Sequence, residues 1–304
     1  MAWRSVPAFA VVALLLGTLG GCDSPPPFVQ LSGLVLDARL QEISGIAASR
    51  RHADTVWMVN DGGSAPELHA VSRRGSRIAT LRLQGVDNTD WEDLAAFELD
   101  GRHYLLVADT GDNGGLRKTL QLHVVAEPAR LVDAAVEPAW SIVFRWPDGA
   151  RDCEAVAVDA ARGEVLLISK KRQPPELFAL PLRPAPGGEP LVARALGSLR
   201  GVPQGDADEV RANPDIARIR SQVTAVDIAP DGRAMAVLTY RDVLLYPRHG
   251  REAWARAVAR RPTVHPLPWL PQAEALGWSA DGLALYATGE ISPSPLLYLN
   301  PRHD

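Results

Sequence analysis

The sequence predicts an all-β fold, and within that class a five-bladed β-propeller of four-stranded antiparallel blades. Three observations lead to this prediction. A short strand signature recurs five times, starting at Ser44, Glu92, Glu154, Thr224 and Glu274. A turn signal and a second apolar run follow each start, and the same spacing of sixteen residues leads from each start to the end of its hairpin. The chain between copies is long enough for two further strands, which gives the composition of a propeller blade.

The N-terminal segment, residues 1–21, is expected to be a lipoprotein signal peptide and not part of the fold. Arg4 precedes an apolar run that is too short for an ordinary membrane-spanning helix. Leu19-Gly20-Gly21-Cys22 resembles the lipobox of bacterial lipoproteins. The resemblance implies cleavage before Cys22, lipidation of Cys22, and a membrane anchor for a chain that faces the periplasm of the bacterial cell envelope. A plain secretory signal stays open as the alternative.

Residues 22–27 are predicted to form a short tether, because consecutive prolines follow the lipidated Cys22 and cannot join a sheet centrally. Asp23 resembles the inner-membrane retention signal of enteric bacteria. That resemblance implies the inner membrane, although the outer membrane stays open. Residues 28–304 are then expected to be a single propeller domain.

Composition limits the classes of partner and chemistry. The formal net charge is -4, with 36 Asp and Glu against 32 Lys and Arg, so no basic surface recommends nucleic acid as a partner. Once Cys22 is acylated, Cys153 is the one remaining thiol, so no internal disulfide is expected and Cys153 is interpreted as a buried filler. No Gly-x-Ser-x-Gly motif supports a serine hydrolase.

The first and last strands are expected to share a blade. Residues 28–36 precede the first repeat, whereas the last repeat has room for only three strands. The N-terminal strand can complete the last blade and close the ring, which removes exposed sheet edges. The outer strands of the first four repeats are expected at residues 67–71 and 77–83, 120–125 and 140–144, 177–182 and 191–196, and 243–246 and 264–269.

Two insertions interrupt the repeat. Residues 201–221 are polar and rich in turn residues, so we expect a surface loop on the top face, where the first strand of each blade begins. A lid over that face and a degenerate sixth blade stay open. Residues 251–260 have apolar side chains at helical spacing, which predicts a helix on the outside of the ring, with a membrane-touching helix as the alternative. Four tryptophans are expected to pack between blades, namely Trp57, Trp91, Trp140 and Trp278.

The five strand starts are expected to crowd together where the inner strands meet. Three of them are carboxylates, which repel each other and lose hydration unless a cation lies among them. Ca²⁺ accepts several oxygen ligands of mixed type, so we expect a metal site formed by Ser44, Glu92, Glu154, Thr224 and Glu274. The alternative is that the carboxylates accept hydrogen bonds from backbone amides of neighbouring inner strands and border a water-filled channel.

The order Ser, Glu, Glu, Thr, Glu over five blades resembles the central Ca²⁺ ring of the calcium-activated nucleotidases, which are five-bladed propellers. The openings Ile43-Ser44-Gly45-Ile46 and Asp152-Cys153-Glu154-Ala155 are also similar to bacterial phytase-like propellers. These resemblances imply the same five ligands for Ca²⁺, with Thr224 as a conservative departure.

A second set of residues is expected on the same face, because the loop between the second and third strands of a blade lies beside the start of its first strand. Asp61 and Asp109 lie in acidic, glycine-rich loops, while Lys170 and Arg241 come from the third and fourth blades. As candidate catalytic residues, Lys170 and Arg241 would hold the oxygens of a phosphate ester, and Asp61 or Asp109 would orient water.

We therefore expect a membrane-tethered, Ca²⁺-binding propeller that hydrolyses or binds a phosphorylated small molecule on its top face. If it is an enzyme, we expect a calcium-dependent phosphohydrolase. The alternative is a non-enzymatic module whose top face binds an envelope protein or a glycan, because the fold alone does not decide function.

Overall fold

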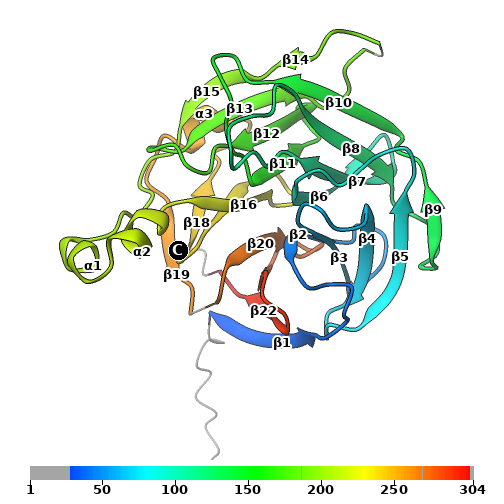
Figure 1. Cartoon of the computed structure of the whole chain (residues 1–304), viewed down its shortest axis with the longest axis horizontal. Coiled ribbons are helices and arrows are strands. Elements are labelled where there is room, and N and C mark those ends of the chain that lie inside the picture. The colour runs from blue at the N-terminus through cyan, green and yellow to red at the C-terminus, as the bar shows by residue number, and fades with distance from the viewer. Residues whose placement is uncertain (1–27, 186, 269, 302–304) are drawn as a thin grey trace, which may run out of the picture.

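Short apolar runs separated by turn residues fold each repeat into an antiparallel meander, whose inner strands are buried on both faces. In the computed structural model, which describes residues 28–185, 187–268 and 270–301, these meanders form five sheets arranged in a ring (Figure 1). The fold is therefore the predicted five-bladed β-propeller. Residues 201–221 do not add a sixth sheet.

The blades follow chain order. Blade 1 contains β2 (Ile43–Ala48), β3 (Thr55–Asn60), β4 (Glu67–Ser72) and β5 (Arg77–Leu83). Blade 2 contains β6 (Trp91–Leu99), β7 (Arg102–Asp109), β8 (Leu120–Ala126) and β10 (Trp140–Arg145). Blade 3 contains β11 (Ala155–Asp159), β12 (Glu164–Ile168), β13 (Glu176–Pro181) and β15 (Arg194–Ser198). Blade 4 contains β16 (Val223–Ile228), β17 (Ala234–Thr239), β18 (Asp242–Pro247) and β19 (Thr263–Pro266). Blade 5 contains β20 (Ala273–Trp278), β21 (Leu285–Gly289), β22 (Ser294–Leu299) and β1 (Val29–Val35).

Two short parallel strands extend the sheets beyond the predicted four strands. β9 (Ala134–Val136) pairs with β5 of blade 1, and β14 (Leu191–Val192) pairs with β10 of blade 2. The strand expected at residues 191–196 is therefore divided between two blades. Buried Ala193 lies at the division, and its amide donates to the carbonyl of Arg145, so the chain passes to the next sheet without losing a hydrogen bond.

The N-terminal strand closes the ring as expected. β1 pairs antiparallel with β22, from Val29 opposite Leu299 to Val35 opposite Ser294. It also touches blade 1, because Ser32 Oγ donates to the carbonyl of Arg73 (2.7 Å). Gly33 lies so close to the Arg74 backbone that a Cβ there would be 2.3 Å from the Arg74 carbonyl carbon. One strand thus joins the last blade to the first.

The buried apolar side chains form one cluster at each junction between neighbouring blades. Trp57 and Trp91 are buried between blades 1 and 2, and Trp278 between blades 4 and 5, as expected. Trp140 is partly buried between blades 2 and 3. Cys153 is a buried free cysteine, and burial raises the pKa of its thiol. The core therefore lies between the blades and leaves the ends of the axis to polar side chains.

The insertion at residues 201–221 forms two short helices, α1 (Ala207–Ala212) and α2 (Pro214–Ile219), where a loop was expected. Asp206 caps α1 and Asn213 caps α2, which explains how a polar segment becomes helical. Gln204 and Ser221 bond to Gln173 in the top-face loop of blade 3. The helices themselves project outward from the ring and do not cover the axis (Figure 1).

The helix expected in residues 251–260 is α3 (Trp254–Ala257), a single turn at the outside of the junction between blades 3 and 4. Trp254 is buried in the cluster between blades 3 and 4, and its Nε1 donates to Asp159 Oδ2 (2.8 Å). Its apolar side therefore packs on the protein. Among the described residues, no helix has both the length and the apolar character needed to cross a bilayer.

Candidate functional site

The five predicted metal ligands occupy equivalent irregular positions in their blades. We call Ser44, Glu92, Glu154, Thr224 and Glu274 the ring residues. In four blades the pairing of the first two strands shifts register at the ring residue, which leaves Ser44, Glu92, Thr224 and Glu274 outside the regular ladder. In blade 3, Glu154 directly precedes β11. A β-bulge redirects the side chain that it carries. A bulge at the ring residue is therefore shared by the first strands of four of the five blades.

The two ring hydroxyls bind the backbone of the next blade. Ser44 Oγ donates to the carbonyl of Trp91 (2.8 Å), and Thr224 Oγ1 donates to the carbonyl of Ala273 (2.7 Å). Trp91 and Ala273 directly precede Glu92 and Glu274 in the sequence. Each hydroxyl thus fixes the strand start that presents the neighbouring ring glutamate.

The protein places its own cation among the ring glutamates. Buried Lys170 forms an ion pair with Glu154, and its ammonium lies over the ring of Tyr240 at 5.5 Å from the centroid. Tyr240 Oη donates to Glu274 Oε1 (3.0 Å). Burial opposes the charge on Lys170, but Glu154 and Tyr240 outweigh it and raise the pKa of Lys170. The ammonium therefore compensates the side of the ring that contains Glu154 and Glu274.

The other side of the ring carries an excess of carboxylates. One carboxylate oxygen from each of Asp61, Asp90 and Glu92 lies within 4.8 Å of the other two. The same holds for Glu92, Asp152 and Glu154. Glu92 belongs to both groups. Burial, together with the charge of Asp61, raises the pKa of Asp90 to about 6. Burial, followed by the charges of Glu154 and Asp61, holds the pKa of Glu92 well above its ordinary value. We call Asp61, Asp90, Glu92 and Asp152 the acidic cluster.

The sequence prediction included Glu92 and Asp61 but missed Asp90 and Asp152. Both precede a ring glutamate by two residues, in Asp90-Trp91-Glu92 and Asp152-Cys153-Glu154. Residues two apart in an extended chain point to the same side, so this repeated Asp-x-Glu spacing was the signal that could have found them.

Glycines allow the surrounding loops to approach the acidic cluster. A Cβ on Gly111 would lie 2.2 Å from Glu92 Oε1 and 2.4 Å from the carboxylate of Asp90. A Cβ on Gly62 would lie 2.6 Å from Asp90 Oδ1. These glycines belong to the two acidic loops singled out in the sequence, and any side chain at either position would collide with the carboxylates.

The four predicted catalytic residues have different surroundings. Asp61 joins the acidic cluster, and Lys170 is held by Glu154. Asp109 is buried, pairs with Arg117 Nη2 (2.6 Å) and accepts from the amide of Asp90 (3.2 Å). Arg241 is exposed at the start of β18. Asp61 and Lys170 thus lie at the ring, whereas Asp109 supports the backbone that carries Asp90.

A cavity of about 250 Å³ adjoins the acidic cluster through Asp152. Its walls are residues 112–115 and 150–152, with Lys171 and Arg172 on the remaining side. Lys171 Nζ lies 2.9 Å from Asp152 Oδ2 and 2.7 Å from Asn113 Oδ1. The side chains of Lys171 and Arg172 are about half exposed. We call this space the top-face cavity; it joins a carboxylate of the cluster to two cationic side chains.

Comparison with known proteins adds little to this picture. Neither a scan against protein-family models nor a search of curated proteins finds a match. A search of solved structures finds hydrazine synthase of Kuenenia stuttgartiensis at 12% identity and a TM-score of 0.44, with 86% of this chain and 72% of that chain covered. A likeness at this level carries no argument about function. The resemblance to calcium-activated nucleotidases and phytase-like propellers therefore stays a prediction.

Proposed function

We propose that this propeller binds Ca²⁺ at the acidic cluster and uses the ion to bind, and to hydrolyse, a phosphorylated small molecule on the top face. The observation that carries the proposal is the pair of overlapping carboxylate groups that share Glu92. Lys170 compensates Glu154 and Glu274 but leaves Asp61, Asp90 and Glu92 in excess. A divalent cation would relieve this repulsion.

The donor atoms fit a hard cation. All four members of the cluster are carboxylates, and Ca²⁺ takes six to eight oxygen ligands in flexible geometry. Glu154 Oε2 and Asp152 Oδ2 are buried and accept no hydrogen bond from the described residues, although the ammonium of Lys171 lies close to Asp152. Compared with the symmetric ring expected from the sequence, this proposal moves the ion toward Glu92. Ser44 and Thr224 then act mainly by positioning strands.

The top-face cavity suits a phosphate group beside such an ion. Lys171 and Arg172 would bind the outer phosphate oxygens, while the cation would neutralise charge on the oxygens nearest Asp152. Asp61 is half-buried and at the cluster, so it is the better candidate to orient water, because Asp109 is committed to Arg117. Lys170 holds Glu154, and in this proposal it does not contact substrate.

A second function, docking of an envelope protein, is favoured by the projecting helices. Val210 on α1 and Ile216 on α2 are 48% and 51% exposed. Together they would offer a partner protein an apolar contact on the part of the molecule that projects from the ring. The membrane tether through Cys22 lies outside the described residues and stays a prediction from the sequence.

Thermal unfolding in chelator and then in rising Ca²⁺ tests the proposed ion. We expect stabilisation of about 2.7 kcal/mol at roughly a hundred times the dissociation constant. The effect should be lost in Glu92→Gln and Asp90→Asn but kept in Glu98→Gln, a matched control because Glu98 lies on the same strand and is exposed. No Ca²⁺-dependent shift in the parent protein would sink the metal site.

Phosphate release from nucleotides, sugar phosphates and phytate then tests the chemistry. We expect Ca²⁺-dependent release that falls about tenfold in Lys171→Gln, because one charge-assisted contact to phosphate is lost. Ca²⁺ binding without binding or release of any of these compounds would leave the docking function as the better explanation.

A further inference from the structure

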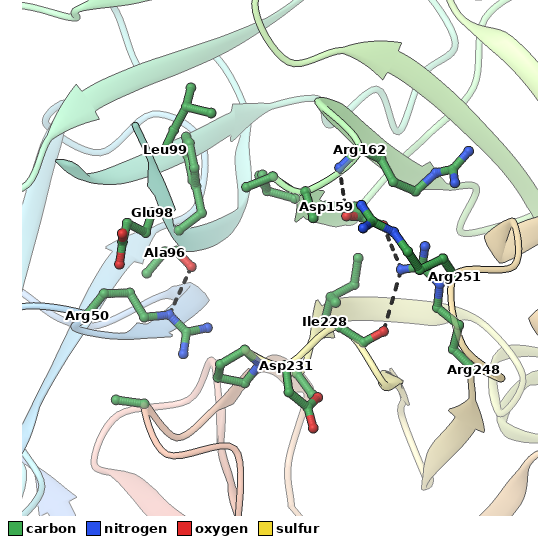
Figure 2. A pocket seen from close by; sticks show the side chains of 18 of the residues that line it. Arg50, Ala96, Glu98, Leu99, Asp159, Arg162, Ile228, Asp231, Arg248 and Arg251 are labelled. Atoms are coloured by element: carbon green, nitrogen blue, oxygen red, sulfur yellow. Dashed lines mark hydrogen bonds and ion pairs between the residues drawn. The ribbon is translucent and has the colours of Figure 1, made fainter. Parts of the chain in front are cut away.

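The bottom end of the ring axis, opposite the acidic cluster, contains a cavity of about 840 Å³ (Figure 2). Its walls come mainly from the ends of the first strands and the turns that follow them in all five blades, and Arg248, Gly250 and Arg251 after β18 complete them. They include Arg50, residues 96–100, residues 158–162, residues 228–232 and Ala280. The volume lies within the usual range for small-molecule sites. We call this space the bottom cavity.

Arg50 brings an unpaired cationic donor to the bottom cavity. Its Nε donates to the carbonyl of Ala96 (3.1 Å), which fixes the guanidinium. Its Nη1 is buried and has no hydrogen-bond partner among the described residues. A buried donor without an acceptor is costly, and for a charged group the cost is larger. The site therefore lacks a hydrogen-bond acceptor at Nη1, although the buried carboxylate of Asp227 interacts electrostatically with Arg50.

Two more arginines, Arg248 and Arg251, lie across the bottom cavity from Arg50 (Figure 2). Arg248 is held by Asp159 Oδ2 (2.8 Å) and by the carbonyl of Glu252 (2.8 Å), and its guanidinium stacks over Trp254. Arg251 is exposed at the rim and forms no ion pair with the described residues. Asp159 compensates the charge of Arg248, so the free positive charge of the opposite wall comes from Arg251.

The acidic side chains around the bottom cavity are mostly committed elsewhere. Asp159 accepts from Arg248, Trp254 and the amide of Arg162. Asp231 pairs with Arg233, and Asp100 with Arg183. Glu98 is exposed. The remaining walls are apolar, with Phe97, Leu99, Val158, Ile228 and Pro230 among them.

We propose that the bottom cavity binds a small organic anion, whose carboxylate or phosphate head bonds to Arg50 and whose apolar body lies on the surrounding walls. A guanidinium offers paired donors in the geometry that both oxyanions accept. The site needs no metal ion and is independent of the acidic cluster. It gives the two ends of the axis opposite ligand preferences.

Isothermal titration of the protein in chelator, with hexanoate and separately with inorganic phosphate, tests this site. Chloride at equal ionic strength is the reference, and the two probes distinguish a carboxylate from a phosphate head. We expect saturable binding of at least one probe, weakened about tenfold in Arg50→Gln because a charge-assisted bond is lost. Arg218→Gln, a change of an exposed arginine that pairs with Asp215 outside the cavity lining, should keep the parent affinity.

Arg251→Gln provides a second test that does not disturb the interior, because Arg251 is exposed at the rim. We expect binding weakened about threefold, as for loss of an exposed charge. Arg50→Gln and Arg251→Gln proteins that both bind the probes like the parent would overturn the proposal. So would a parent protein that responds to both probes as it does to chloride.

Discussion

At the scale of single residues, two buried aspartates connect neighbouring inner strands through hydrogen bonds to backbone amides. Asp93 accepts from the amides of Leu94 and Val156 (both 2.8 Å), and Asp227 accepts from those of Ile228 (2.8 Å) and Trp278 (2.7 Å). The sequence suggested this role for the ring glutamates as the alternative to metal binding. The structure gives it to Asp93, the direct neighbour of Glu92, because the bulge there lets adjacent residues both point inward.

Asp227 should make stability depend on pH. Burial, only partly offset by Arg50, raises its pKa from 3.8 to about 6. The folded protein then binds more protons than the unfolded chain between about pH 4 and pH 6, so its free energy of unfolding falls as pH rises through this window. Above about pH 6, the free energy of unfolding is lower than at acid pH by a contribution from Asp227 on the order of 3 kcal/mol.

Urea unfolding of Asp227→Asn in chelator, at several pH values from about 4.5 to 7.5, checks this expectation. The stability of the variant relative to the parent should improve with rising pH. Asp231→Asn, at an exposed position just after the same strand, should show no such trend. A stability difference between Asp227→Asn and the parent that stays constant over this range would contradict the assignment.

At the scale of elements, the strands were predictable because apolar runs at a fixed spacing, with regular turn signals between them, leave little choice of partner. Most expected strands match the observed ones within a few residues, including the N-terminal strand that completes blade 5. The division at Ala193 was not predictable, because a continuous apolar run does not show which sheet receives it. The helices α1 and α2 were missed because they bury almost nothing and depend on their caps.

The hydroxyl of Thr224 should stabilise the junction of β16 with β20. Thr224→Val keeps the shape of the side chain but leaves the buried carbonyl of Ala273 without its donor, which costs about 1–3 kcal/mol. Thr224→Ser retains the donor and serves as the matched control. Chemical unfolding in chelator measures this contribution apart from any bound ion. Equal losses in the two variants would show that the hydrogen bond contributes nothing.

At the scale of the whole molecule, the candidate site shows where sequence reasoning stops. The repeat predicted that Glu92, Glu154 and Glu274 share one end of the axis, and Glu92 and Glu154 do meet there. It did not predict that Lys170 folds back onto Glu154, because the direction of a long side chain is set by tertiary packing. The bottom cavity was not predictable from a repeated motif, because none of the other four turns has an arginine at the position of Arg50. Arg162, also in the lining, lies at a different position of its repeat.

Closure of the ring should depend on Gly33. In Gly33→Ala the new methyl group would collide with the Arg74 backbone and displace β1 from blade 1. We expect a loss of about 1–3 kcal/mol in the free energy of unfolding, as for an overpacked core. Gly188→Ala, with no atom within 4 Å of its Cβ, is the control. Equal unfolding midpoints for the parent and Gly33→Ala would show that β1 tolerates a shift.

Because of the parallel strands β9 and β14, the boundaries of the sequence repeats differ from the boundaries of the sheets. β9 belongs in sequence to blade 2 but hydrogen-bonds to blade 1, and β14 belongs to blade 3 but hydrogen-bonds to blade 2. Blades 2 and 3 therefore each supply a strand that covers the outer edge of the blade before them. A cut between blades 1 and 2, or between blades 2 and 3, would sever one of these pairings, so blade 1 or blade 2 excised by itself would lose the strand that covers its outer edge.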